Sequence, residues 1–271
     1  MLKEEKSVNK VIELCAPKYD LPPENKTSKR YIILSSQRTG SSYIARRLCN
    51  IKDQFGFPME YLNLRAIRAL LPRLFTDYDL KKDYPLNKYI EALTKVRTSR
   101  DGLFGNKVQP NQLAVILKNN KNLMKEFIYQ HDYIVVMTRK NKLEQSVSNA
   151  IATITDEWHP GEKQFIFDNK KKEKAYKQIN ADILRFSKEE DFMLSIAKAS
   201  KKPSLIIEYE DIQSNPNESM KRLVNFLSQN NSGESIEEDN YVEVPKKNSS
   251  ELNQELKNNY MKFISGDLNI T

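Results

Sequence analysis

The stretch YIILSSQRTGSSYIARRLCNI, residues 31–51, joins an apolar run to a polar loop and then to an amphipathic segment. The run YIILSS (31–36) is apolar up to its last two residues, which is typical of a buried strand. After the loop, apolar side chains recur at helical spacing, at Tyr43, Ile44, Leu48 and Ile51. The stretch therefore predicts a strand, a loop and a helix in succession.

The same order of strand and helix occurs twice more along the chain. After YIVVMT (133–138), apolar side chains recur at helical spacing from Leu143 onward. SLIIEY (204–209) precedes a helix for which Asn215 is the expected cap and Pro216 the first-turn residue. Continuous apolar strands that alternate with helices are typical of a parallel sheet covered on both faces. The sequence therefore predicts an α/β fold with a central parallel sheet flanked by helices.

The remaining segments add elements to this one domain. We expect amphipathic helices at 62–74, 86–98, 112–129 and 175–200, and a further strand at 102–108. Residues 1–30 are polar and contain three prolines, so we expect an N-terminal extension there and a single domain over 31–271. The Lys-rich stretch 163–177 and the acidic stretch 234–243 are expected to be solvated surfaces.

Composition excludes several classes of protein. The formal net charge of +8 over 271 residues favours anionic partners, namely nucleic acid, anionic lipid or a small phosphorylated ligand. The seven glycines form neither the Rossmann nor the Walker A fingerprint. Two cysteines, Cys15 and Cys49, are too few for a disulfide framework and lack zinc spacing. With no apolar run of signal-peptide or membrane-spanning length, we expect a cytoplasmic protein.

The loop after the first strand has the features of an anion site. In an open parallel sheet, ligands bind beyond the carboxyl ends of the strands, and the unpaired N–H groups of the next helix attract phosphate or sulfate there. Gly40 permits close backbone approach, and Arg38 adds a planar guanidinium that matches tetrahedral oxyanions. The alternative is an ordinary capped helix beside a solvent-exposed arginine.

The second strand carries a related pair of residues. Arg139 follows YIVVMT directly, and Ser148 lies nine residues further on. Both are expected near the carboxyl edge of the sheet, beside the first loop. Two separate anion-binding groups in one cleft suit a doubly phosphorylated nucleotide.

Four ordered blocks of the sequence resemble one enzyme family. They are YIILSSQRTGSSYIARRL (31–48), FGFPMEYLN (55–63), GLFGNKV (102–108) and TRKNKLEQSVSNAIATITDEW (138–158). Together they are similar to the trehalose 2-sulfotransferase family of bacteria, within the superfamily of carbohydrate sulfotransferases that use 3′-phosphoadenosine 5′-phosphosulfate (PAPS). The resemblance implies a P-loop-like sulfotransferase architecture and transfer of a sulfuryl group to a hydroxyl of a carbohydrate or glycolipid, without a metal ion.

The resemblance also implies roles for individual residues. The donor site would consist of Ser36, Gln37, Arg38, Thr39, Gly40, Ser41, Ser42, Arg139 and Ser148, with Arg38 stabilising the leaving phosphate. The residues themselves suggest the acceptor site, for which we expect Tyr61, Lys107, Trp158 and His159. Lys107 could reach the transferring sulfonate or the acceptor, and the alternative is a solvated lysine at a strand end. Trp158 could support the face of a sugar, and the alternative is a packing role. Glu60 matches the family's proposed catalytic base.

The choice of base rests on pKa and position. We expect apolar neighbours (Phe57, Met59 and Tyr61) to desolvate the Glu60 carboxylate and raise its pKa toward the working range. His159 remains an alternative base. His131 precedes a strand and therefore lies toward the far end of the sheet, where we expect a structural role.

Two other functions remain as alternatives. One is a P-loop-like nucleotide-dependent kinase, against which stands the missing Walker lysine. The other is a basic nucleic-acid-binding protein without catalysis, although aromatic residues do not alternate with basic ones as such binding requires. We expect no nucleic acid partner. Peripheral membrane contact is expected only if the acceptor is a lipid, and a homodimer is left open.

Overall fold

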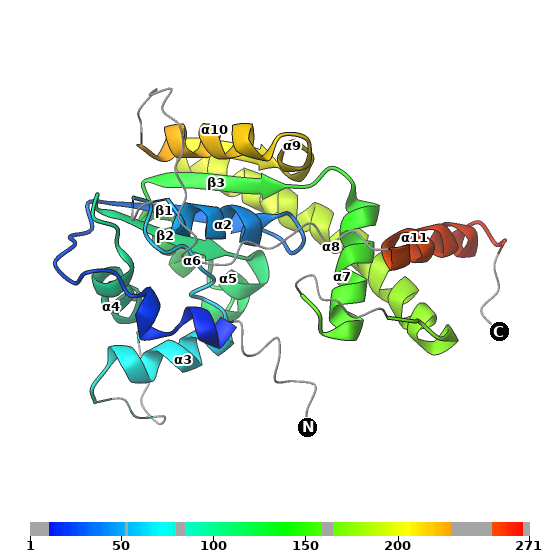
Figure 1. Ribbon diagram of the computed structural model, residues 1–271, viewed down its shortest axis with the longest axis horizontal. Coiled ribbons are helices and arrows are strands. Elements are labelled where there is room, and N and C mark those ends of the chain that lie inside the picture. Colours follow the sequence, from blue (N-terminus) through cyan, green and yellow to red (C-terminus); the bar gives the residue numbers. More distant parts are fainter. Residues whose placement is uncertain are drawn as a thin grey trace.

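In the part of the chain that the structure, a computed structural model, describes, four strands form one sheet (Figure 1). The structure describes residues 11–51, 54–77, 79, 85–158, 165–228 and 251–267. The strands are β1 (Lys29–Ser35), β2 (Leu103–Val108), β3 (Tyr133–Thr138) and β4 (Ser204–Glu208). They lie in the order β2-β1-β3-β4, and every neighbouring pair is parallel. The predicted α/β fold with a central parallel sheet is confirmed.

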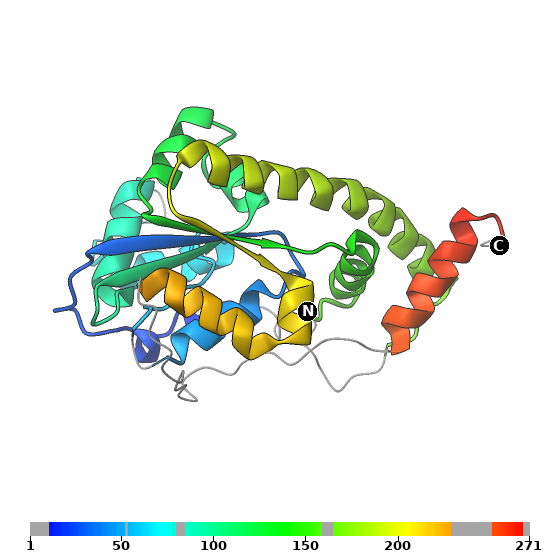
Figure 2. The same ribbon diagram turned by 90° about the horizontal axis from the view of Figure 1, so that it is seen from above.

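Helices surround this sheet on both faces (Figures 1 and 2). They are α2 (Ser41–Cys49), α3 (Leu64–Leu74), α4 (Leu86–Arg97), α5 (Pro110–Ile116), α6 (Lys121–Tyr129), α7 (Lys142–Thr155), α8 (Asn169–Ser200), α9 (Tyr209–Ser214), α10 (Pro216–Ser228) and α11 (Glu251–Ile264), and a short 3-10 helix, η1 (Pro17–Tyr19), precedes β1. In the described part of the chain, no helix has the length and apolar character needed to cross a membrane.

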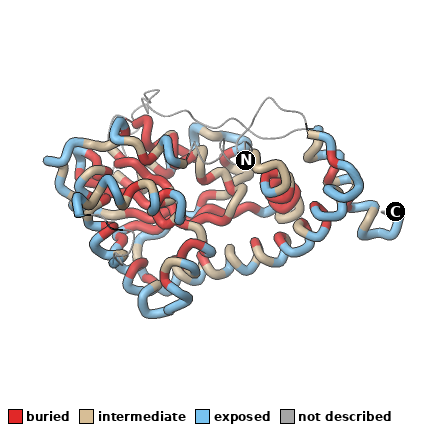
Figure 3. The backbone as a smooth tube through the Cα atoms, turned by 90° about the horizontal axis from the view of Figure 1, so that it is seen from below, coloured by how far each residue is buried: buried red, intermediate tan, exposed pale blue. Residues whose placement is uncertain are grey.

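Among the described residues, the buried apolar side chains form three clusters. On one face of the sheet, Ile33 of β1 packs with residues of α2 and α10. On the other face, Ile32 and Leu34 pack with α3, α4, α6 and the carboxyl-terminal part of α8. A third cluster joins α7 and α11 to the amino-terminal part of α8, beside the sheet. Figure 3 shows the buried interior of the molecule and the exposed outer sides of its helices. β2, β3 and most of β1 are buried, whereas the edge strand β4 is partly exposed. The inner strands β1 and β3 are apolar on both sides because helices cover both faces of the sheet there.

Two predicted helices have different bounds in the structure. The helix expected at 112–129 is two helices, because Lys118 and Asn119 adopt left-handed backbone angles that end α5. Apolar periodicity did not reveal this break, since both helices turn apolar side chains toward the same core. The helix expected at 175–200 begins at Asn169, where the side chain of Asp168 accepts a hydrogen bond from the Lys171 N–H.

Part of the predicted N-terminal extension packs against the domain. Cys15 and Tyr19 are buried in the cluster on the α3–α4 side. Asp20 pairs with Arg97 at 3.1 Å and with Arg73 at 2.5 Å. The Arg97 side chain is fully buried. Its positive charge is compensated by the Asp20 carboxylate and by the Tyr19 carbonyl, to which the guanidinium donates.

His131 lies before β3, at the end of the sheet opposite the loop after β1. It is buried and contacts the Phe127 carbonyl through Nδ1 at 3.0 Å. Burial lowers the pKa of His131 to about 4, so the ring is neutral at pH 7. This position and environment agree with the structural role expected for His131.

Gly56→Ala is expected to lower the free energy of unfolding by about 2–4 kcal/mol. The Gly56 backbone has φ +70°, and a Cβ there would lie 2.7 Å from the Leu103 carbonyl oxygen and 2.8 Å from that of Arg97. Gly266→Ala is the matched control, because Gly266 has φ +83° with nothing within 4 Å of an added Cβ. Urea titrations of both variants check the prediction, and equal losses would contradict it.

Candidate functional site

The loop between β1 and α2 has a backbone suited to holding an anion. Arg38 and Gly40 adopt left-handed angles, with φ 64° and 78°. Gly40 is the residue before α2, and a Cβ there would lie 3.3 Å from the Tyr209 ring. The first N–H groups of α2 have no partner inside the helix and point out of its amino end. The loop therefore combines free backbone donors with a close approach that favours glycine.

Arg38 contacts Ser148 and Arg139, the two residues that the sequence predicts as a second anion-binding group. Its Nε donates to Ser148 Oγ at 2.9 Å, and its NH1 donates to the Trp158 carbonyl at 2.8 Å. Arg139 donates from NH1 to the Arg38 carbonyl at 3.0 Å. Burial, together with the nearby charge of Arg139, lowers the pKa of Arg38 to about 10. Arg38 is thus still a cation at pH 7, and an anion bound beside both guanidinium groups would relieve their repulsion.

Arg139 is held in place on several sides. Its guanidinium lies 4.0 Å above the Tyr209 ring, and NH2 is 3.6 Å from a Glu144 carboxylate oxygen. Burial also lowers the pKa of Arg139. Its Nε is buried and has no hydrogen-bond partner among the described residues. A phosphate oxygen would satisfy such a donor, so Arg139 fits the phosphorylated donor that the sequence predicts.

Gln145, which the sequence did not single out, supports the loop from α7. Its side chain is fully buried, and Nε2 donates to the Gln37 carbonyl at 2.7 Å and to Ser36 Oγ at 3.3 Å. Gln145 lies one helical turn before Ser148, on the same face of α7. That spacing was the only signal in the sequence for its role.

Glu60 lies in a polar cluster beside the start of α2. Its Oε1 is 2.8 Å from Lys107 Nζ, which also donates to Ser42 Oγ at 2.9 Å. Two amides from the start of α5 complete the cluster, with Gln109 Nε2 donating to Oε1 at 3.1 Å and Gln112 Nε2 donating to Oε2 at 2.7 Å. Lys107 therefore connects the carboxylate to the first turn of α2.

The expectation of a raised pKa for Glu60 is wrong. Burial raises the pKa of this carboxyl, but the Lys107 ammonium and hydrogen bonds from Lys107, Gln112 and Asn63 lower it below its usual value. Phe57, Met59 and Tyr61 are buried in the core, and burial acts on the carboxyl as expected, but the Lys107 ammonium and the hydrogen bonds outweigh it. Glu60 is consequently an ionised carboxylate at neutral pH.

Tyr61 is a packing residue in this structure. Its ring is fully buried and stacks on Phe104, with centroids 5.8 Å apart. Its hydroxyl donates to the Phe57 carbonyl at 2.5 Å. The ring is therefore part of the core in this structure, and a contact between Tyr61 and an acceptor stays a prediction.

The other three residues expected on the acceptor side have different outcomes. Lys107 is buried at the end of β2 and bound to Glu60 and Ser42. Trp158 is half-buried, and its indole N–H donates to Asp156 Oδ1 at 3.2 Å. His159 lies outside the described residues.

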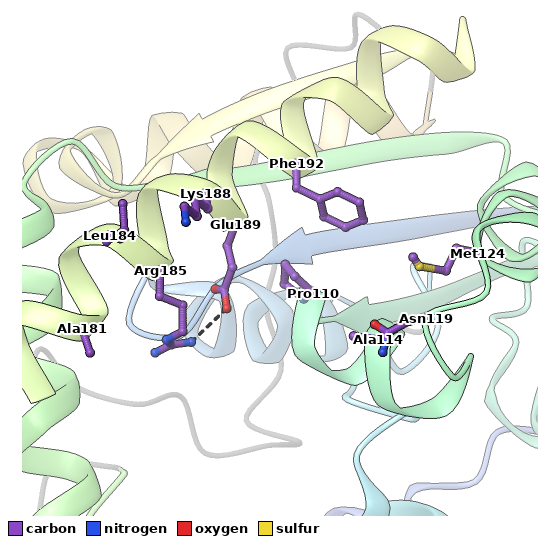
Figure 4. A pocket seen from close by; sticks show the side chains of 10 residues that line it. All are labelled: Pro110, Ala114, Asn119, Met124, Ala181, Leu184, Arg185, Lys188, Glu189 and Phe192. Carbon is purple, nitrogen blue, oxygen red and sulfur yellow. Dashed lines mark hydrogen bonds and ion pairs between the residues drawn. The ribbon is translucent and has the colours of Figure 1, made fainter.

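A pocket of about 480 Å³ opens between α5, α6 and α8 (Figure 4). Its walls combine apolar side chains with charged ones, including Pro110, Leu184, Phe192, Arg185, Lys188 and Glu189. Pro110 follows Gln109, an amide partner of Glu60, and Arg185 donates to Gln37 Oε1 in the loop after β1 at 2.9 Å. The pocket has the size and composition of a small-molecule site.

Comparisons with known proteins show the family of this chain. The family model described as Stf0 sulphotransferase matches residues 30–261. A crystal structure of a sulfotransferase from Alicyclobacillus acidocaldarius is 14% identical with a TM-score of 0.47, over 89% of this chain and 93% of that one. A search of curated proteins finds no significant match. Because the family model spans most of the chain, including the loop after β1, Glu60 and Arg139, the protein belongs to the Stf0 sulphotransferase family.

Proposed function

We propose that this sulfotransferase takes its sulfuryl group from PAPS and transfers it to a hydroxyl of a carbohydrate or glycolipid. The observation that carries the proposal is the meeting of Arg38, Arg139 and Ser148 at the amino end of α2. Two guanidinium groups beside one phosphate-binding loop suit a donor with phosphates on two positions of its ribose.

The donor-site residues divide the two phosphates between them. The loop amides from Thr39 to Ser42 and the Arg38 guanidinium would bind the 5′-phosphosulfate, where negative charge grows on the leaving phosphate. Arg139 and Ser148 would bind the 3′-phosphate. The Nε of Arg139, which has no hydrogen-bond partner in the described part of the chain, supports this assignment, because a buried donor without a partner costs about 1–3 kcal/mol.

Glu60 and Lys107 would act on the acceptor side of the transfer. Glu60 accepts the proton of the acceptor hydroxyl as its oxygen bonds to sulfur and the bond from sulfur to the phosphate oxygen breaks. Lys107, 2.8 Å from Glu60 and 2.9 Å from Ser42 Oγ, lies between the base and the donor loop, where its charge would bind a sulfonate oxygen.

The acceptor would bind in the pocket between α5, α6 and α8. Its walls adjoin both the amide partners of Glu60 and the donor loop. Apolar surfaces such as Phe192 suit the C–H faces of a sugar, while Lys188 and Glu189 offer a hydrogen-bond donor and an acceptor for hydroxyls.

Sulfate transfer tests the proposed function directly. Purified protein is mixed with PAPS labelled in its sulfate and with a panel of mono- and disaccharides and glycolipids, without added metal. We expect labelled product together with 3′-phosphoadenosine 5′-phosphate (PAP). Magnesium-dependent turnover of ATP in place of this transfer would instead favour the kinase alternative.

Arg139→Ala is expected to weaken PAP binding about 10- to 100-fold, because it removes charge-assisted hydrogen bonds to the 3′-phosphate. Adenosine 5′-phosphosulfate, which lacks that phosphate, should bind the variant within about threefold of the unmodified protein. Calorimetric titration with both ligands measures the difference. An equal loss for the two would reject Arg139 as the 3′-phosphate group.

A further inference from the structure

Arg185 of α8 lies outside the four sequence blocks and yet reaches the donor loop. Its NH1 donates to Gln37 Oε1 at 2.9 Å, across 148 residues of sequence. The same side chain lines the pocket between α5, α6 and α8 (Figure 4). Arg185 therefore contacts both halves of the site.

A buried carboxylate fixes the orientation of Arg185. Asp182 is fully buried, and its Oδ1 accepts from Arg185 Nε at 3.0 Å and from NH2 at 2.8 Å. Asn149 donates to Asp182 Oδ2 at 2.8 Å, and Gln178 donates to Oδ1 at 3.0 Å. Asn149 is the residue after Ser148, so this network begins beside the contact between Ser148 and Arg38. The guanidinium is thus held in one geometry before any ligand binds.

Gln37 is consequently held from two helices. Gln145 of α7 donates to its main-chain carbonyl, and Arg185 of α8 donates to its side chain. All three guanidinium nitrogens of Arg185 have partners. Nε and NH2 donate to Asp182, and NH1 donates to Gln37 and also, at 2.9 Å, to Glu189 Oε1. Arg185 therefore acts on the loop through Gln37 and not as a free cation.

We propose that Arg185 is a positioning residue that sets the geometry of the donor loop through Gln37 and couples that loop to the acceptor pocket. The coupling passes through Glu189, which shares NH1 with Gln37. The second carboxylate oxygen of Glu189, Oε2, is buried without a hydrogen-bond partner among the described residues. A sugar hydroxyl that draws the Glu189 carboxylate toward itself would change the contact between Arg185 and Gln37. The inference rests on the proposed PAPS-dependent function.

Calorimetric titration with PAP tests the proposal without requiring the acceptor. Arg185→Met and Gln37→Ala are each expected to weaken PAP binding about tenfold. The double variant should also lose about tenfold and not about 100-fold, because both substitutions remove the same contact. Arg185→Lys keeps the charge and loses only the planar fork, so it should resemble Arg185→Met and also serves if Arg185→Met does not fold.

Lys177→Met is the matched control, since Lys177 lies on the same helix and pairs only with Glu173 at the surface among the contacts described. We expect its PAP affinity to stay within about twofold of the unmodified protein. Thermal unfolding of each variant separates a loss of stability from a loss of loop geometry. Unchanged PAP binding by Arg185→Met, or additive losses in the double variant, would overturn the proposal. Failure of the unmodified protein to bind PAP would instead overturn the proposed function, and the inference with it.

Discussion

Arg38→Ala is expected to lower the rate constant of sulfuryl transfer about 1,000-fold. Arg38 Nε lies 2.9 Å from Ser148 Oγ, at the amino end of α2. In the proposed function, the leaving phosphate would gain negative charge there. A fixed charge in a partly desolvated site stabilises the transition state more than the ground state, so the rate constant falls further than the binding of PAP. Single-turnover assays with labelled PAPS separate the two quantities.

Two further variants make the Arg38 result specific. Arg38→Lys keeps a cation but cannot bind two oxygens in one plane, so it should recover only part of the lost rate. Arg100→Ala removes an exposed arginine that precedes β2, at the opposite end of the sheet, and should leave the rate within about twofold. A fully active Arg38→Ala variant would remove Arg38 from the mechanism.

Glu60→Gln is expected to lower turnover about 100- to 10,000-fold while PAP affinity changes by less than about threefold. The amide keeps the shape of the carboxylate but cannot accept the proton of the acceptor hydroxyl. It also leaves the buried Lys107 ammonium without the negative charge that lies 2.8 Å away, so unfolding is measured in parallel. Glu173→Gln is the control, because it changes a surface carboxylate on α8. Turnover close to that of the unmodified protein would exclude Glu60 as the base.

The pH dependence of turnover gives a second test of Glu60. Since the pKa of Glu60 is lowered, the carboxylate is ionised above its usual pKa and is protonated only as the pH falls through the lowered value. Activity should therefore persist to acidic pH. Lys107→Met removes the ammonium that lowers the pKa and leaves burial, which raises it, so the acidic limb should move to higher pH. If the acidic limb of the pH–activity profile does not move, a group other than Glu60 is responsible for that limb.

Much of this site was predictable because its residues lie next to strands in the sequence. The side chains of Arg38 and Arg139 follow β1 and β3, which are neighbours in a parallel sheet whose carboxyl ends lie at one edge. That edge is where ligands bind in such folds. The contact between Arg38 and Ser148 across 110 residues follows from this topology.

Other parts of the site depended on contacts that periodicity does not encode. The pKa of Glu60 was expected to rise because its sequence neighbours are apolar, yet those neighbours belong to the core and Lys107 lies against the carboxylate. Tyr61 was assigned to the acceptor by its block, and tertiary packing buried it completely. Arg185 had no local signal at all, since it reaches Gln37 only through the packing of α8 beside the loop.

The sequence by itself determined the strand–loop–helix order, the parallel sheet and the residues at its carboxyl edge, because burial of apolar strands and chain order are local properties. The tertiary structure alone decided the charge state of Glu60, the burial of Tyr61 and the two-sided hold on Gln37. Each of these depends on contacts between residues distant in sequence, whose free energies depend on burial and distance. Neither quantity exists until the chain has folded.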